Sequence, residues 1–116
     1  MSVVVTATAL NTGEYVADSN TLIYEVPSST RTIIDKFTAN NASGASATLT
    51  VYLVPNGQSV GAQYMILDGV SIADAGNLDI TQAKNHVLET GGRIYCISGT
   101  NNAISVRVSG RQVVTS

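Results

Sequence analysis

Hydrophobic and polar residues alternate along two segments of the chain with a period of two. In the first, Leu49, Val51 and Leu53 alternate with Thr and Tyr, and residues 104–109 repeat the pattern with Ser and Arg. Because successive side chains of a strand point to opposite faces, each segment predicts a strand with one buried face. The residues that this pattern directs into the core are Leu49, Val51, Leu53, Ile104, Val106 and Val108.

Further strands and their turns follow from composition. Segments rich in Val, Ile, Tyr, Phe and Thr lie between turn residues at 22–26, 32–38, 64–72 and 93–98, and weaker patterns at 3–9 and 112–115 predict terminal strands. Asn and Gly in residues 40–44 tolerate positive φ, which predicts a hairpin between strand 32–38 and strand 48–54. Apolar residues at near-helical spacing predict one short helix between residues 79 and 88.

Many short strands at regular spacing predict an all-β fold, a single β-sandwich or jelly-roll-like domain with one short helix. The length of 116 residues fits one domain. Within it, we expect residues 1–29 to form an N-terminal arm or edge strands and residues 30–116 to form the sandwich core.

Between Lys36 and Asp68 the chain runs through 31 residues without a charge. A soluble monomer normally places charges on its exposed strand edges, which discourages pairing with other chains. Uncharged polar side chains can meet a protein neighbour without the cost of desolvating ions. We therefore predict an assembly surface here, with candidate interface residues Thr48, Thr50, Tyr52, Asn56, Gln58, Gln63 and Tyr64.

Charge and hydropathy narrow the range of partners. A net charge of −2 gives no basic footprint for nucleic acid or for an anionic membrane. No apolar segment is long enough to cross a membrane, and residues 1–6 lack the features of a signal peptide. We expect synthesis in a cytosol, with no direct binding of nucleic acid or membrane.

Residues that could carry chemistry are few. Cys96 is the only cysteine and lies in an apolar run, which favours a buried thiol over a nucleophile. His86 is the only histidine, and a zinc ligand or general base needs partners that the sequence does not supply. Asp68, Asp74 and Asp79 lack EF-hand spacing; Asp68 and Asp74 are more simply turn residues, and Asp79 is a candidate cap of the short helix. Calcium is the minor alternative, since loop ligands in β-sandwiches need not follow a linear motif. We predict no enzyme activity, no catalytic residues, no metal and no cofactor.

Five segments of the chain share a further pattern: residues 32–41 (TIIDKFTANN), 47–57 (ATLTVYLVPNG), 64–67, 86–95 and 104–111. Together they resemble small β-sandwich virion proteins of tailed bacteriophages. The resemblance covers roughly residues 30–111, and its motifs are structural, so it brings no catalytic residues. It implies a virion component, either a capsid cement (decoration) protein or a part of the neck or tail.

The resemblance also implies partners and a location. We expect contacts with the major capsid protein or other virion proteins, a homo-oligomer with a trimer among the candidate states, and residence in the virion after synthesis in the bacterial cytoplasm. A carbohydrate-binding or receptor-binding sandwich remains an alternative, and a cluster of exposed tyrosines around one loop end would favour it.

Overall fold

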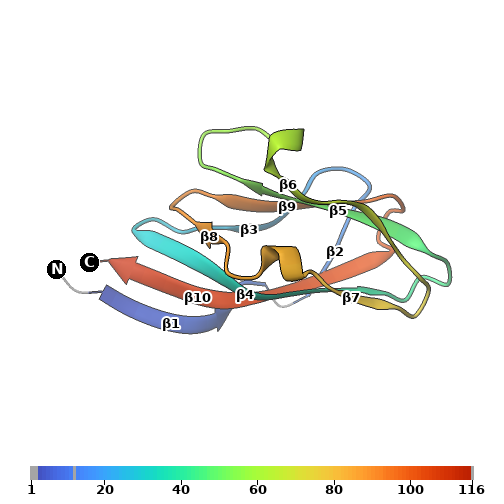
Figure 1. Cartoon of the computed structure of the whole chain (residues 1–116), viewed down its shortest axis with the longest axis horizontal. Helices are drawn as coiled ribbons and strands as arrows, with labels where there is room; N and C mark the ends of the chain where they lie inside the picture. Colours follow the sequence, from blue (N-terminus) through green and yellow to red (C-terminus); the bar gives the residue numbers. More distant parts are fainter. Residues whose placement is uncertain (1–2, 12, 116) are drawn as a thin grey trace.

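A computed structural model describes residues 3–11 and 13–115, which form two antiparallel sheets packed face to face (Figure 1). Sheet A contains β1 (Val3–Ala9), β2 (Glu14–Tyr15), β4 (Thr30–Asn41), β7 (Asn77–Asp79), β8 (Val87–Leu88) and β10 (Ile104–Thr115). Sheet B contains β3 (Thr21–Glu25), β5 (Ala47–Val54), β6 (Met65–Ile72) and β9 (Arg93–Ser98). The predicted all-β sandwich is confirmed.

The longest strands, β4 and β10, form the middle of sheet A. Its strand order is β1-β10-β4-β7, with β2 pairing with β10 and β8 with β4, whereas the order of sheet B is β3-β9-β5-β6. Because β4 and β10 have twelve residues each, sheet A extends beyond sheet B at the end where β1 lies (Figure 1). The molecule is therefore elongated, with extents of 51 × 26 × 19 Å.

The predicted hairpin between strands 32–38 and 48–54 is wrong. β4 pairs with β10, β7 and β8 in sheet A, whereas β5 pairs with β9 and β6 in sheet B. The loop after β4 crosses between the sheets, and the buried side chain of Asn41 fixes this crossing. Its amide Nδ2 donates to the carbonyls of Ala45 (2.8 Å) and Ile72 (2.9 Å), and Ile72 belongs to sheet B.

The core agrees with the alternation in five of six positions. Of the six predicted residues, all except Leu53 are at most 1% exposed. Leu53 is half-buried because it lines an open cleft between the sheets, and the register between β5 and β6 also shifts just before it. Phe37 of β4, in sheet A, is the largest fully buried side chain.

Only one turn of the short helix predicted within 79–88 is present. The segment contains the end of β7, one 3-10 turn (η2, Thr81–Ala83) and the two-residue strand β8. Asn85 has a φ of +70°, which interrupts any helix, and the segment is held along the edge of β4. There the amide of Ile80 donates to the carbonyl of Phe37, and Asn85 donates to Ile34.

The second 3-10 turn, η1 (Ala62–Tyr64), precedes β6. Among the described residues, no helix is long or apolar enough to span a membrane.

Candidate assembly surface

The outer face of sheet B carries a continuous band of aromatic and aliphatic side chains. In the paired strands Tyr52 lies opposite both Tyr95 and Met65, and Tyr95 lies opposite Leu22, so one row crosses all four strands. A second row begins where Thr50 lies opposite Ile97. We call this surface the tyrosine face and define it by Leu22, Thr48, Thr50, Tyr52, Met65, Tyr95 and Ile97.

No residue of the tyrosine face is charged. Charged groups lie at its margins, where Arg93 and Glu25 pair at 3.6 Å at one end and Asp68 stands on the edge strand β6. Thr50 adds local order, because its hydroxyl accepts a hydrogen bond of 2.9 Å from the amide of Gly69. The face can therefore be covered by a protein neighbour without removing an ion from water.

The outer face of sheet A is chemically different. Four of the six Lys and Arg residues of the chain lie on its central strands β4 and β10. Arg111 holds Asp35 with two nitrogens at 2.9–3.1 Å, and Lys36 reaches Asp79 at 2.7 Å. The outer face of sheet A thus carries exposed charges, whereas the tyrosine face of sheet B is neutral.

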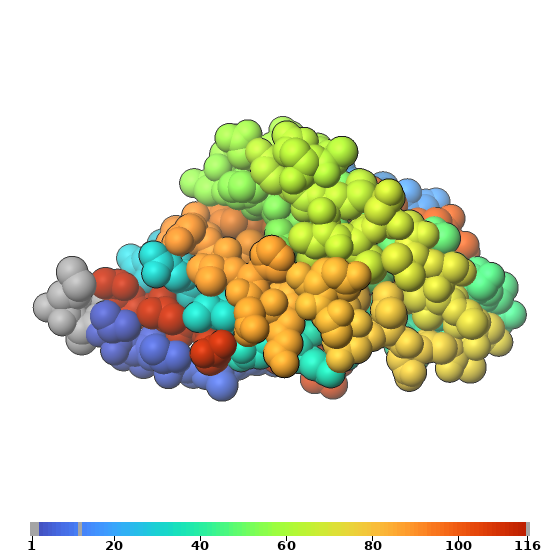
Figure 2. Space-filling model, viewed as in Figure 1, coloured from blue at the N-terminus to red at the C-terminus, as the bar shows by residue number. Residues whose placement is uncertain are grey.

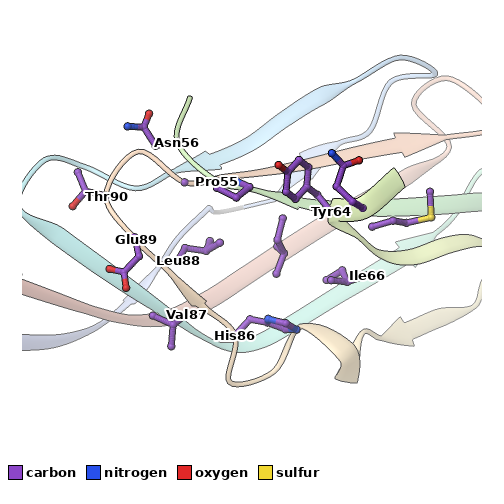
Figure 3. Close-up of a pocket in the computed structure, with 13 residues that line it drawn as sticks. Pro55, Asn56, Tyr64, Ile66, His86, Val87, Leu88, Glu89 and Thr90 are labelled. Atoms are coloured by element: carbon purple, nitrogen blue, oxygen red, sulfur yellow. The ribbon is translucent and has the colours of Figure 1, made fainter. Parts of the chain in front are cut away.

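A cleft of about 540 Å³ opens between the two sheets at the edge formed by β6 and β8 (Figure 2). Tyr64, Ile66 and Pro55 border it from the side of sheet B, and His86 and Leu88 border it from the side of sheet A (Figure 3). The full lining is Leu53, Pro55, Asn56, Gln63, Tyr64, Met65, Ile66, His86, Val87, Leu88, Glu89, Thr90 and Gly92. The lining is mainly apolar, so the cleft suits an apolar group better than an ion.

The structure places six of the seven predicted interface residues on these two surfaces. Thr48, Thr50 and Tyr52 belong to the tyrosine face, because alternate residues of β5 point outward. Three more of them, Asn56, Gln63 and Tyr64, line the cleft. The seventh, Gln58, is exposed on the loop after β5, where its backbone N–H donates to the carbonyl of Pro55 at 3.2 Å.

Sequence reasoning missed the part of the tyrosine face that comes from β3 and β9. Tyr95 and Ile97 point outward, whereas Ile94 and Cys96, which alternate with them, are fully buried. Because apolar residues occupy both faces of β9, the sequence does not show which set points outward. Leu22, which is 43% exposed, gave no signal beyond its place in a predicted strand.

The residues with potential for chemistry lie apart from one another. Cys96 is buried, as predicted, and burial raises the pKa of its thiol, with the charge of the Glu14 carboxylate adding to the effect. A protonated thiol is a poor nucleophile. His86 is exposed at the cleft, and its side chain and that of Glu89 point in different directions (Figure 3).

Two of the three carboxylates considered for calcium, Asp74 and Asp79, have other roles. Asp74 accepts a hydrogen bond of 2.8 Å from the amide of Gly44, and Asp79 pairs with Lys36. Within residues 3–11 and 13–115, no three His, Cys, Asp or Glu side chains form a group that could hold a metal ion. Asp74 and Asp79 thus order loops and strand edges.

Comparisons with known proteins show the fold. The chain matches no family model and no curated protein sequence. Among solved structures, it is similar to a chain from the disulfide-linked pili of Bacillus endospore appendages, with 12% identity, a TM-score of 0.55, and coverage of 97% of this chain and 88% of that one.

A second solved structure belongs to the T13 viral particle of infectious bursal disease virus. There the identity is 7% and the TM-score 0.50, and the match covers 97% of this chain but only 31% of that chain. The class defined by fold and comparison is therefore a β-sandwich of a kind found in pili and in icosahedral viral particles. Neither structure links the chain to tailed bacteriophages.

Proposed function

We propose that this protein is a non-enzymatic structural subunit of a tailed-phage virion, and that it decorates the capsid by docking through the tyrosine face. The observation that carries this proposal is the contrast between the two faces. Sheet A presents ion pairs to water, while sheet B presents an uncharged surface rich in Tyr and aliphatic residues. Tyr and Met are enriched at protein interfaces, and charged residues are depleted in their cores.

The mechanism of such a protein is mechanical. A cement protein bridges neighbouring subunits of the shell, so its binding free energy opposes the pressure of packaged DNA. This action needs an interface of about 800 Å² per partner and several symmetry-related copies. It needs no nucleophile, metal or shifted pKa. The partner in this proposal is the major capsid protein.

The alternative of a carbohydrate-binding module gains no support from the placement of the tyrosines. Tyr52 and Tyr95 lie on the face of sheet B, Tyr64 lies in the cleft, and Tyr15 lies on β2. Tyr24 is half-buried, and its hydroxyl binds Thr32 and Gln112 at 2.8 Å each. They do not gather around one loop end, which is where a sugar site would need them.

A neck or tail protein could dock through the same face. The number of copies per virion distinguishes that role from capsid decoration. We expect hundreds of copies per virion for a cement protein and about a dozen for a neck or tail component, because copy number follows the symmetry of the site. Virions without the protein should release their DNA at a lower temperature than complete virions. Equal heat resistance would contradict the cement role.

A substitution pair tests the docking face. Thr50→Lys places a cation in the tyrosine face, and Thr38→Lys makes the same change at a half-buried position on the outer face of sheet A. We expect Thr50→Lys to weaken binding to particles at least about tenfold and Thr38→Lys to leave it within about twofold. Both variants must show the thermal transition of the wild type. Equal binding of the two would exclude the tyrosine face as the contact.

A further inference from the structure

Strand β1 forms an open edge of sheet A that has none of the usual protection. It pairs with β10 in regular register over seven residues, from Val3 opposite Thr115 to Ala9 opposite Ser109. Its sequence, VVVTATA, has no charge, proline or glycine. In a strand order of β1-β10-β4-β7, its other edge faces no strand among the described residues. Such an edge is a template for pairing with another strand.

The valines of β1 are exposed on both sides of the sheet. Val3, Val4 and Val5 are 58%, 56% and 59% exposed, and Val114 and Thr115 of β10, which lie opposite Val4 and Val3, are exposed as well. Val4 lies opposite Val114, on the side facing sheet B, but sheet B does not extend this far (Figure 1). Apolar side chains gathered on an unpaired edge favour covering by a protein partner.

The other three sheet edges are protected. On the far edge of sheet A, β7 and β8 have three and two residues, and Asp79 of β7 pairs with Lys36. In sheet B, β6 carries Asp68 and two shifts of register, and β3 has a shift between Leu22 and Tyr24. Short strands, charges and bulges all discourage pairing. Among these edges, the best match for an uncharged, regular β1 is another β1.

We propose that β1 pairs antiparallel with β1 of a second copy of this chain and joins the two A sheets into one continuous sheet. An interface between identical surfaces requires a twofold axis, and antiparallel neighbours in one sheet place that axis perpendicular to the sheet. Each copy then shows the same face to the same side. The pairing covers the valines of β1 and satisfies backbone groups of both edges.

This arrangement has a consequence for docking. Sheet B lies on one side of sheet A, so the dimer presents two tyrosine faces on the same side. If both dock on one surface, the second contact forms within the complex and the dimer binds more tightly than one copy. The pairing itself does not depend on the proposed function, because it is measured in solution without any particle.

Sedimentation of the full chain over about a hundredfold range of concentration tests the pairing. We expect the wild type to be in monomer–dimer equilibrium. Replacing Val3 and Val5 together by Lys places charges on one side of the edge, and Val4→Lys places one on the other side. Each change should raise the dissociation constant of the dimer at least about tenfold, because like charges meet across the axis.

The matched control is Val87→Lys, since Val87 is 50% exposed in β8 at the opposite edge of sheet A. It should change the dissociation constant by less than about twofold. All variants should keep the thermal transition of the wild type, because the substituted side chains are exposed. A wild type that stays monomeric, dimers that persist in both β1 variants, or assemblies that keep growing with concentration would each overturn the proposal.

Discussion

Asn41 shows how one residue can fix the path of the chain. Its sequence context, Asn41-Ala42-Ser43, has the form of a glycosylation acceptor, but the side chain is fully buried and its hydrogen bonds lie inside the protein. Besides its two donated bonds, its Oδ1 accepts from the amide (3.0 Å) and the hydroxyl (2.8 Å) of Ser43. The residue therefore ties the crossing loop to both sheets.

Asn41→Ala should lower the free energy of unfolding by about 1–3 kcal/mol, because the carbonyl of Ile72 loses its donor in a buried site. Asn40→Ala is the matched control, since Asn40 is the exposed neighbour, and it should cost at most about 0.5 kcal/mol. Urea unfolding measures both values. Similar values for the two variants would show that Asn41 does not hold the crossing.

Cys96 predicts a pH dependence of stability. In the unfolded chain a thiol ionises above about pH 8.5, but in the folded protein burial raises the pKa of Cys96 and keeps it protonated. Above that pH the unfolded state binds fewer protons than the folded state, so stability falls as pH rises. The stabilising contribution is complete below about pH 8.5 and declines by at most about 1.4 kcal/mol per pH unit above it.

Comparison with Cys96→Ala isolates this effect, because the titration of Tyr and Lys is common to both proteins. The wild type should be the more stable protein near neutral pH, since the variant leaves a cavity. The difference in free energy of unfolding between the wild type and Cys96→Ala should decrease between about pH 9 and pH 10, as measured by urea unfolding. An advantage that stays constant over this range would mean that the thiol ionises in the folded protein as well.

At the scale of elements, the pairing of β4 with β10 depends on a bulge and on a glycine. The register shifts between Ser109 and Gly110, so that Asp35 is an extra residue of β4, and its carboxylate receives Arg111. A Cβ on Gly110 would collide with the backbone carbonyl of Ile33. Close approach of the two central strands of sheet A therefore requires Gly at this position.

Gly110→Ala should destabilise the protein by about 1–3 kcal/mol, because backbone atoms must move to accommodate the methyl group. Gly61→Ala is the control. There a Cβ meets only the end of the flexible Gln63 side chain, so we expect a change of at most about 0.5 kcal/mol. Thermal unfolding of the two variants measures the difference. A mild effect of Gly110→Ala would mean that the bulge can relax.

The sequence predicted some of these elements correctly and others not. Alternation located strands at 48–54 and 104–109 correctly, because period-two burial is a local property. Turn residues after Asn41 marked the end of a strand, but turn chemistry does not determine whether the next strand joins the same sheet. The spacing of Ile80, Ala83 and Val87 imitated a helix, although positive φ at Asn85 and bonds to β4 oppose one.

The sequence predicted only the part of the candidate surface that comes from a single strand. The uncharged run gave the β5 part of the tyrosine face, because the outward residues of one strand follow from alternation. Tyr95 and Leu22 could not be assigned to the same face, since their position depends on pairing β9 with both β5 and β3. Likewise, the cleft joins residues near 64 with residues near 87, which only the packing of the two sheets brings together.

At the scale of the whole molecule, the two sheets present different surfaces. Sheet A holds most of the cationic residues and an open edge at β1, and sheet B holds the neutral face. A subunit built this way can pair along its edge and still dock through its face, because the two surfaces do not overlap. The central claim is that the tyrosine face is covered in the assembled particle.

Hydroxyl-radical footprinting of tyrosines tests this claim most directly, with the free protein compared to protein bound on virions. Tyr52 and Tyr95 report on the tyrosine face, and Tyr15, which is 65% exposed on β2 of sheet A, is the internal reference. Our account predicts that binding lowers the oxidation of Tyr52 and Tyr95 several-fold and leaves Tyr15 unchanged, because a covered side chain loses contact with water. Unchanged oxidation of Tyr52 and Tyr95, with protection of Tyr15 instead, would contradict it.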